Sequence, residues 1–178
     1  MTALRQKQPV LKPQDLLVAL KIAVNDERIL TFAELGHELS ISTSEVHAAS
    51  QRAEMSRLLT REFGQLRAAR SSLQEFILHG VKYSFPALMG SITRGMATGI
   101  AAPSLRELFA QSDELISVWP DSEGGERGLS LQPLYPSVPA AARADSRLYE
   151  ALVMVDALRV GSAREREIAA SKLMSLLP

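Results

Sequence analysis

Residues 31–53 read TFAELGHELSISTSEVHAASQRA, and this stretch decides the expected fold because it contains two helix starts separated by a short turn. The first start is Thr31-Phe-Ala-Glu34, a capping box in which the threonine and glutamate side chains each accept a hydrogen bond from the other residue's amide. The second, Ser42-Thr-Ser-Glu45, has the same spacing. We therefore predict a helix as far as about Leu39, a short turn, and another helix from Ser42.

The helix that begins at Ser42 is expected to have two faces. Apolar or small residues recur at helical spacing and form a narrow stripe that should face inward: Val46, Ala49, Ser50 and Ala53. Polar side chains remain for the outer face: Ser44, His47, Gln51 and Arg52. Glutamine can pair with adenine, arginine with guanine or phosphate, and hydroxyl groups with phosphate. This outer face therefore has the chemistry of a DNA-reading surface.

Elements on both sides extend this pair of helices. Upstream, apolar residues at helical spacing predict a helix from Lys12 to Val24, and residues 28–30 are compatible with a minor strand. Downstream, we interpret residues 56–70 as a helix extension followed by a two-stranded wing. Between positions 57 and 70 the sequence has four arginines and a single acidic residue, Glu62, which makes this the densest positive segment of the chain. It is interpreted as a phosphate clamp, with a merely solvated surface as the alternative.

The segment 31–53 resembles the helix-turn-helix of bacterial winged-helix transcriptional regulators, including the MarR type. Core contacts, the turn and the start of the second helix carry the resemblance: Leu35, Leu39, Ile41-Ser42, Ser44 and Val46. It implies that the second helix enters the major groove of DNA and that the wing contacts the backbone. Two positions depart from the pattern. Gly36 replaces the usual alanine, which makes the helix less favourable by roughly 1 kcal/mol. Ser40 replaces the usual glycine, so the turn requires either a serine in the left-handed conformation or a different turn type.

The remaining residues predict a mixed, mostly helical body. A helix over 72–83, ended by Pro86, is expected to bury Leu73, Phe76, Ile77, Val81 and Tyr83, with His79 as a satisfied core residue. Glycines and prolines then dominate, and we expect a tight loop at 90–99, a short helix at 105–109, and short strands at 115–119 and 129–134. Trp119 is interpreted as core. Two helices, 146–158 and 163–177, complete the chain. Residues 76–86 and 118–120 also resemble uncharacterised bacterial proteins, which implies no reaction and no ligand.

Composition excludes several classes of protein. The chain has no cysteine, which removes disulfides and thiolate metal sites and fits a reducing compartment. It has no apolar run that would span a membrane and no secretory signal at the N-terminus, so a cytoplasmic protein is expected. A formal net charge of zero argues against bulk coating of nucleic acid. His37-Glu38 begins like a zinc motif, but Ile41 occupies the second ligand position. We predict no metal, no cofactor and no enzymatic activity.

These observations predict a mainly α protein with an N-terminal winged helix-turn-helix head, residues 1–70, and a mixed, mostly helical C-terminal body, residues 71–178. The predicted function is sequence-specific transcriptional regulation on double-stranded DNA as a homodimer. The alternative is a non-catalytic adaptor or antitoxin-like module that binds a protein partner. The predicted DNA-binding residues are Ser42, Thr43, Ser44, His47, Gln51, Arg52, Arg57, Arg61, Arg67 and Arg70.

The homodimer is expected to be held by the two closing helices, where apolar residues repeat at three- and four-residue spacing. The residues proposed for this surface are Leu148, Leu152, Val155, Leu158, Ile168, Leu173, Leu176 and Leu177. The alternative is that these side chains complete the core of a monomer.

Overall fold

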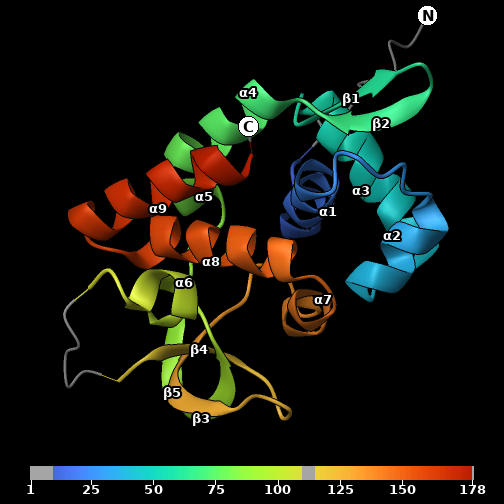
Figure 1. Cartoon of the computed structure of the whole chain (residues 1–178). Helices are drawn as coiled ribbons and strands as arrows, with labels where there is room; N and C mark the ends of the chain where they lie inside the picture. The colour runs from blue at the N-terminus through green and yellow to red at the C-terminus, as the bar shows by residue number, and fades with distance from the viewer. Residues whose placement is uncertain (1–9, 110–114, 178) are drawn as a thin grey trace, which may run out of the picture.

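The computed structural model describes residues 10–109 and 115–177. Within these residues the fold is mixed, with 56% of residues in helices and 17% in strands. Helices dominate, and the strands form two small, separate sheets. Figure 1 shows one sheet beside the N-terminal helices and the other below the C-terminal helices. The predicted predominance of helix is therefore confirmed, and the body has more sheet than expected.

The N-terminal elements follow the predicted order. They are α1 (Pro13–Val24), α2 (Phe32–Leu39), α3 (Thr43–Met55), β1 (Leu59–Glu62) and β2 (Gln65–Ala68). The minor strand predicted at 28–30 is wrong, because these residues form an irregular connection between α1 and α2. Of the helix extension and two-stranded wing expected over residues 56–70, only the two strands are present. The helix α3 ends at Met55, residues 56–58 form a turn, and β1 pairs antiparallel with β2.

The turn between α2 and α3 is held by backbone hydrogen bonds and by one close approach. Ser40 is left-handed, with φ 55° and ψ 43°, so the chain uses the first of the two options predicted for it. The amide of Ile41 donates to the carbonyl of Gly36, which closes the helix end in a Schellman-type arrangement. A Cβ at Gly36 would lie 2.8 Å from the carbonyl oxygen of Ile41. Glycine therefore lets the turn pass close to α2.

The two-residue turn of the β1–β2 hairpin is formed by Phe63 and Gly64. Both residues have positive φ, 50° and 81°, as a type I′ turn requires. Glycine adopts this conformation freely, whereas for a bulky L-residue the left-handed region costs roughly 1–2 kcal/mol. Glu62 pairs with Gln65, so the register places Phe63 at the tip of the hairpin.

A single helical segment connects the hairpin to the body. It comprises α4 (Arg70–Glu75), a π-helical turn η1 (Phe76–Gly80) and α5 (Val81–Ser84). Ile77 and Val81 are buried as predicted, but His79 and Tyr83 are exposed, so their expected burial is wrong. The buried side chains Leu73, Ile77 and Val81 recur every four residues through the π-helical turn, and this spacing leaves His79 and Tyr83 on the exposed side.

Three strands in the body close into a small barrel: β3 (Met89–Ala97), β4 (Ser117–Pro120) and β5 (Glu126–Leu131). β3 pairs antiparallel with both other strands, and β4 pairs parallel with β5. The tight loop predicted at 90–99 is therefore wrong, because most of it is β3. Between β3 and β4 lie the one-turn elements η2 (Gly99–Ala101) and α6 (Pro103–Arg106).

A buried carboxylate on α8 (Ser146–Val160) ties this barrel to the helices. One oxygen of Asp156 accepts hydrogen bonds from Trp119 Nε1 at 2.6 Å and from the Thr98 hydroxyl at 2.8 Å. The other oxygen pairs with Arg159 at 2.7 Å. Burial raises the pKa of Asp156, and the guanidinium opposes that shift. Because Trp119 is fully buried in this network, its interpretation as a core residue is confirmed.

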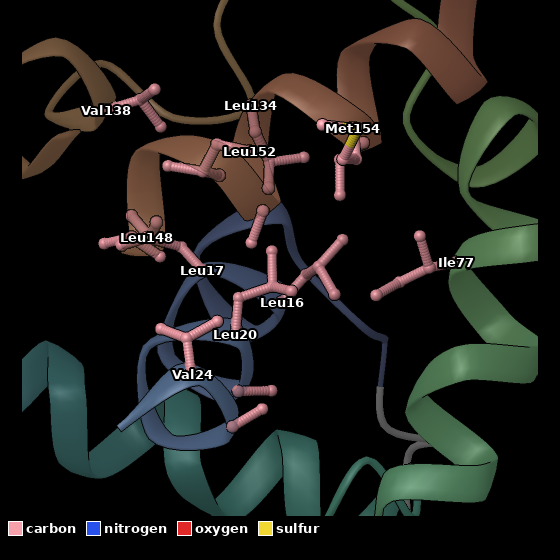
Figure 2. Close-up of a cluster of buried hydrophobic side chains, with 14 of the residues drawn as sticks. Leu16, Leu17, Leu20, Val24, Ile77, Leu134, Val138, Leu148, Leu152 and Met154 are labelled. Carbon is pink, nitrogen blue, oxygen red and sulfur yellow. The ribbon is translucent and has the colours of Figure 1, made fainter. Parts of the chain in front are cut away.

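One continuous core joins the N-terminal elements to the body. Every residue of α1 from Asp15 to Val24 is buried. Leu16, Leu17 and Leu20 face Leu148 and Leu152 of α8, while Ile77 approaches from the side (Figure 2). The core also includes residues of α7 (Val138–Ala144) and α9 (Ala163–Leu176). The segments on the two sides of Arg70 therefore share one core.

The same core contradicts the predicted dimer surface. Most of the apolar residues proposed for it are less than 5% exposed within the single chain: Leu148, Leu152, Val155, Leu158, Leu173 and Leu177. Ile168 and Leu176 are partly buried against this cluster. The alternative interpretation, completion of a monomer's core, describes these side chains correctly. Helical spacing alone identified an apolar face but not what covers it.

Candidate nucleic-acid interface

The exposed face of α3 carries most of the polar residues predicted for it. Ser42, Thr43, Ser44, His47 and Gln51 are all exposed. The Ser42 hydroxyl caps the helix by accepting from the amide of Glu45 at 3.2 Å. The imidazole of His47 packs edge-on against the ring of Phe32, with centroids 5.2 Å apart. The face is therefore polar and held by a capped helix start.

Arg52 does not belong to this face, which corrects its predicted position. Its guanidinium points toward α1, where it binds both oxygens of Asp15, the closest at 2.7 Å. The Asp15 side chain is 0% exposed and that of Arg52 is 16% exposed. A buried carboxylate needs such a partner, since desolvation of an unpaired charge is costly. Arg52 therefore holds α3 against α1 and is not positioned to read bases.

The capping box predicted at the start of α3 is only half formed. Ser42 accepts from the amide of Glu45, but the Glu45 carboxylate binds Arg52 at 2.7 Å and the side-chain amide of Gln14 at 3.0 Å. These hydrogen bonds, led by the one from Gln14, lower the pKa of Glu45. The box at Thr31 and Glu34 is complete, with both reciprocal contacts present. Glu45 thus serves the contact between α1 and α3 instead of its own helix end.

The four arginines of the predicted phosphate clamp lie on or beside the hairpin. Arg61 pairs with Glu54 at 2.8 Å, and Arg70 pairs with Asp26 at 2.7 Å. Arg67 donates to the carbonyl oxygen of Asp26 at 2.6 Å. Exposed Arg57 lies two residues after the end of α3, with φ 60°, and its backbone amide donates to the carbonyl of Glu54. Its guanidinium has no ion-pair or hydrogen-bond partner within residues 10–109 and 115–177. The chain's own carboxylates thus partly neutralise this positive segment.

A polar pocket of about 520 Å³ lies at the base of the hairpin. Its lining combines two guanidinium groups, two carboxylates and two hydroxyl groups: Arg67, Arg70, Asp26, Glu62, Thr60 and Ser71. Because both signs of charge meet in it, the pocket does not select an anion by electrostatics alone.

The most exposed large apolar side chain in the described part of the chain was not predicted as functional. Phe63, at the hairpin tip, has a relative exposure of 103%. A Phe-Gly pair between two strand-like runs is a sequence signal for a turn, but not for an exposed aromatic ring. Its position beside the arginines only emerges once β1 and β2 pair.

A second ionic network fixes α2 to the core. The ammonium group of Lys21, which is 1% exposed, lies 2.6 Å from both Glu38 on α2 and Asp145 at the start of α8. Arg28 also pairs with Glu38 at 2.6 Å. The hydrogen bond from Arg28 and the contacts from Lys21 lower the pKa of Glu38 to about 2. α2 is thereby held in place relative to α1 and α8.

The described residues form neither a candidate metal site nor a candidate membrane-spanning helix. Residues 10–109 and 115–177 contain no cluster of three His, Cys, Asp or Glu side chains that could hold a metal ion. Within the same ranges, no helix combines the length and apolar character needed to cross a membrane.

Comparison with known proteins identifies no relative. No protein-family model, no curated protein and no solved structure matches the chain. The resemblance to winged-helix regulators stays a prediction, and the functional argument rests on residue chemistry and geometry.

Proposed function

We propose that the protein is a cytoplasmic, DNA-binding transcriptional regulator whose residues 10–70 act as a winged helix-turn-helix. The observation that carries this proposal is the exposed polar face of α3, next to an arginine-bearing hairpin. In such a module the second helix of the pair enters the major groove and the wing contacts the backbone. The capped α2–α3 turn and the buried contact between Arg52 and Asp15 support it by holding α3 rigidly.

The side chains on this face suit the two kinds of contact that DNA offers. Gln51 can form a bidentate pair with adenine, and Thr43 and Ser44 can donate to phosphate oxygens near the start of α3. The helix dipole favours phosphate at this end. Arg52 is left out of the proposed contacts. Arg57 is the cation most available to a phosphate group. To bind phosphate, Arg61, Arg67 and Arg70 would first have to give up their present contacts with Glu54 and Asp26.

The test is a selection of duplexes from a random pool by the full chain, followed by anisotropy titration of the selected duplex. Replacing Gln51 with alanine should weaken binding by about 1–3 kcal/mol, as expected for loss of a bidentate base contact. Gln132→Ala, an exposed glutamine of the body, is the matched control and should bind like the original chain. If neither variant changes the affinity, α3 is not the reader.

A second candidate function is protein binding through the same face, as an adaptor or antitoxin-like module. The observation that favours it is the pairing of hairpin arginines with the chain's own carboxylates, in a chain of zero net charge. Salt dependence separates the two functions. For a protein that reads DNA, the logarithm of the binding constant falls linearly with log[salt], because binding releases counterions from the duplex. A protein-binding platform shows no saturable binding of duplex DNA.

A further inference from the structure

The tip of the β1–β2 hairpin combines two features that are unfavourable in the free protein. The Phe63 ring is fully exposed to solvent, and its backbone has φ 50°, a conformation that bulky residues avoid. Asn or Asp is the residue that a type I′ turn favours before glycine. Phenylalanine here stabilises neither the core nor the turn. Its presence points to a contact outside the chain.

The charge around the tip indicates the chemistry of that contact. Between Arg57 and Arg70 the chain carries four arginines and one glutamate. Although Arg61, Arg67 and Arg70 contact Glu54 or Asp26, the guanidinium of Arg57 has no carboxylate partner in the described residues. The positive charge of the hairpin suits a partner with an anionic surface. The apolar ring at its tip suits a partner whose apolar interior becomes accessible when stacked groups separate. Duplex DNA has both, since its phosphates lie outside and its base steps stack inside. A protein partner would instead need an acidic rim around a pocket shaped for the ring.

The dimensions of the hairpin fit such a contact. Each strand has four residues and so extends roughly 13 Å at about 3.4 Å per residue. This is comparable to the width of the major groove, about 12 Å, which the proposed function assigns to α3. A hairpin of this length beside α3 is long enough to extend across the backbone toward the adjacent minor groove.

We propose that Phe63 is an apolar wedge that enters the minor groove of the bound duplex and partly unstacks one base step. This inference rests on the proposed DNA binding and deepens it, because it names the groove, the contact and its effect on the duplex. Apolar side chains inserted in this way kink DNA toward the major groove. Pyrimidine–purine steps unstack most easily, so a TA or CA step is expected where the tip lands.

The test uses the duplex selected by the full chain, labelled with 2-aminopurine at successive positions, because the fluorescence of this base rises when it unstacks. The original chain should raise the signal at one step. Phe63→Asn should abolish the rise and weaken binding by about tenfold or more, as loss of an aromatic contact with a base predicts. Phe63→Leu, which keeps an apolar wedge, should retain part of both effects.

Asparagine is the informative replacement because it removes the ring while matching the turn. Asn-Gly is the preferred pair for a type I′ turn, so Phe63→Asn should unfold at a temperature equal to or above that of the original chain. Weakened binding then reports a lost contact and not a lost fold. If the original chain binds saturably but raises the fluorescence at no step, the wedge alone is overturned. An unchanged affinity together with an unchanged fluorescence rise for Phe63→Asn would also overturn it. Failure of the original chain to bind any selected duplex would overturn the proposed function and the wedge with it.

Discussion

At the scale of single residues, neighbours on α3 have opposite roles. Gln51 is exposed, whereas Arg52 turns to α1 and binds the buried carboxylate of Asp15. A helical wheel places both near the same outer face, because adjacent positions differ by only 100° and arginine is long enough to reach across the helix edge. Arg52, which from its charge is the better candidate for binding DNA, therefore stabilises the fold, and Gln51 remains exposed.

We expect Arg52→Ala to destabilise the protein by roughly 3 kcal/mol, because it leaves the fully buried Asp15 carboxylate without its cation. Gln51→Ala is the control and should change the free energy of unfolding by less than about 0.5 kcal/mol. Urea denaturation followed by circular dichroism measures both. Equal stability of the two variants would contradict the structural role of Arg52.

At the scale of elements, ionic networks set the positions of the first three helices. Asp15, Glu45 and Arg52 join α1 to α3. Lys21 and Glu38 join α1 to α2, and Asp145 extends that network to α8. Because these groups are partly or wholly buried, solvent screens them less than surface pairs. The orientation of α3, and with it the proposed interface, depends on both networks.

These element contacts predict sensitivity to acid. The pKa of Glu38 is about 2 in the folded protein and about 4.5 in the unfolded chain, so its contribution to stability is fully present above pH 4.5. That stability is lost as the pH falls from about 4.5 toward 2, because the unfolded chain then takes up the proton first. We expect a loss of about 2 kcal/mol, reduced from the full shift because Arg28 is partly exposed.

The measurement is urea denaturation at pH 6, 4.5 and 3 for the original chain and for Glu38→Gln. The variant should be less stable at pH 6 and should lose less stability on acidification. Parallel curves for the two proteins would show that another carboxylate dominates the acid response. Asp145 is the next candidate because, although burial opposes it, hydrogen bonds from Lys21 and Asn25 lower its pKa.

At the scale of the whole molecule, α1 is the shared centre of the fold. Its leucines contact α8, and the same helix carries the charged partners of α2 and α3 (Figures 1 and 2). Sequence analysis expected a head and a body, with the closing helices available for a second copy. The apolar faces of those helices instead cover α1 and each other. The homodimer stays a prediction, without these side chains as its surface.

A chain that ends at Arg143 should therefore fail to fold, since it lacks α8 and α9. Each leucine that loses its burial costs about 1.5–3 kcal/mol, and several are affected, which exceeds the usual stability of a domain. Calorimetry of the shortened chain should show no cooperative transition. A cooperative transition, or a dispersed amide spectrum by NMR, would instead indicate that the N-terminal elements fold independently.

Features that depend on neighbours a few residues apart could be predicted from the sequence. The helix starts at Thr31 and Ser42 follow from contacts within one turn of chain. For Ser40 the sequence left two backbone conformations open, and the structure has the left-handed one. Helical periodicity also identified which side chains of α8 are apolar. It misplaced Tyr83, which was expected to be buried and is exposed on the helical segment that follows η1.

Contacts between distant segments determine which of these side chains remain available to a partner. Arg52 is removed from the interface by Asp15, 37 positions earlier, and Leu148 is removed from the surface by α1. Phe63 emerges as the exposed tip only when β1 and β2 pair. Burial and charge pairing depend on contacts between segments far apart in the chain, and no local pattern specifies those contacts. For this reason the sequence could name the candidate interface, but the fold determined its members.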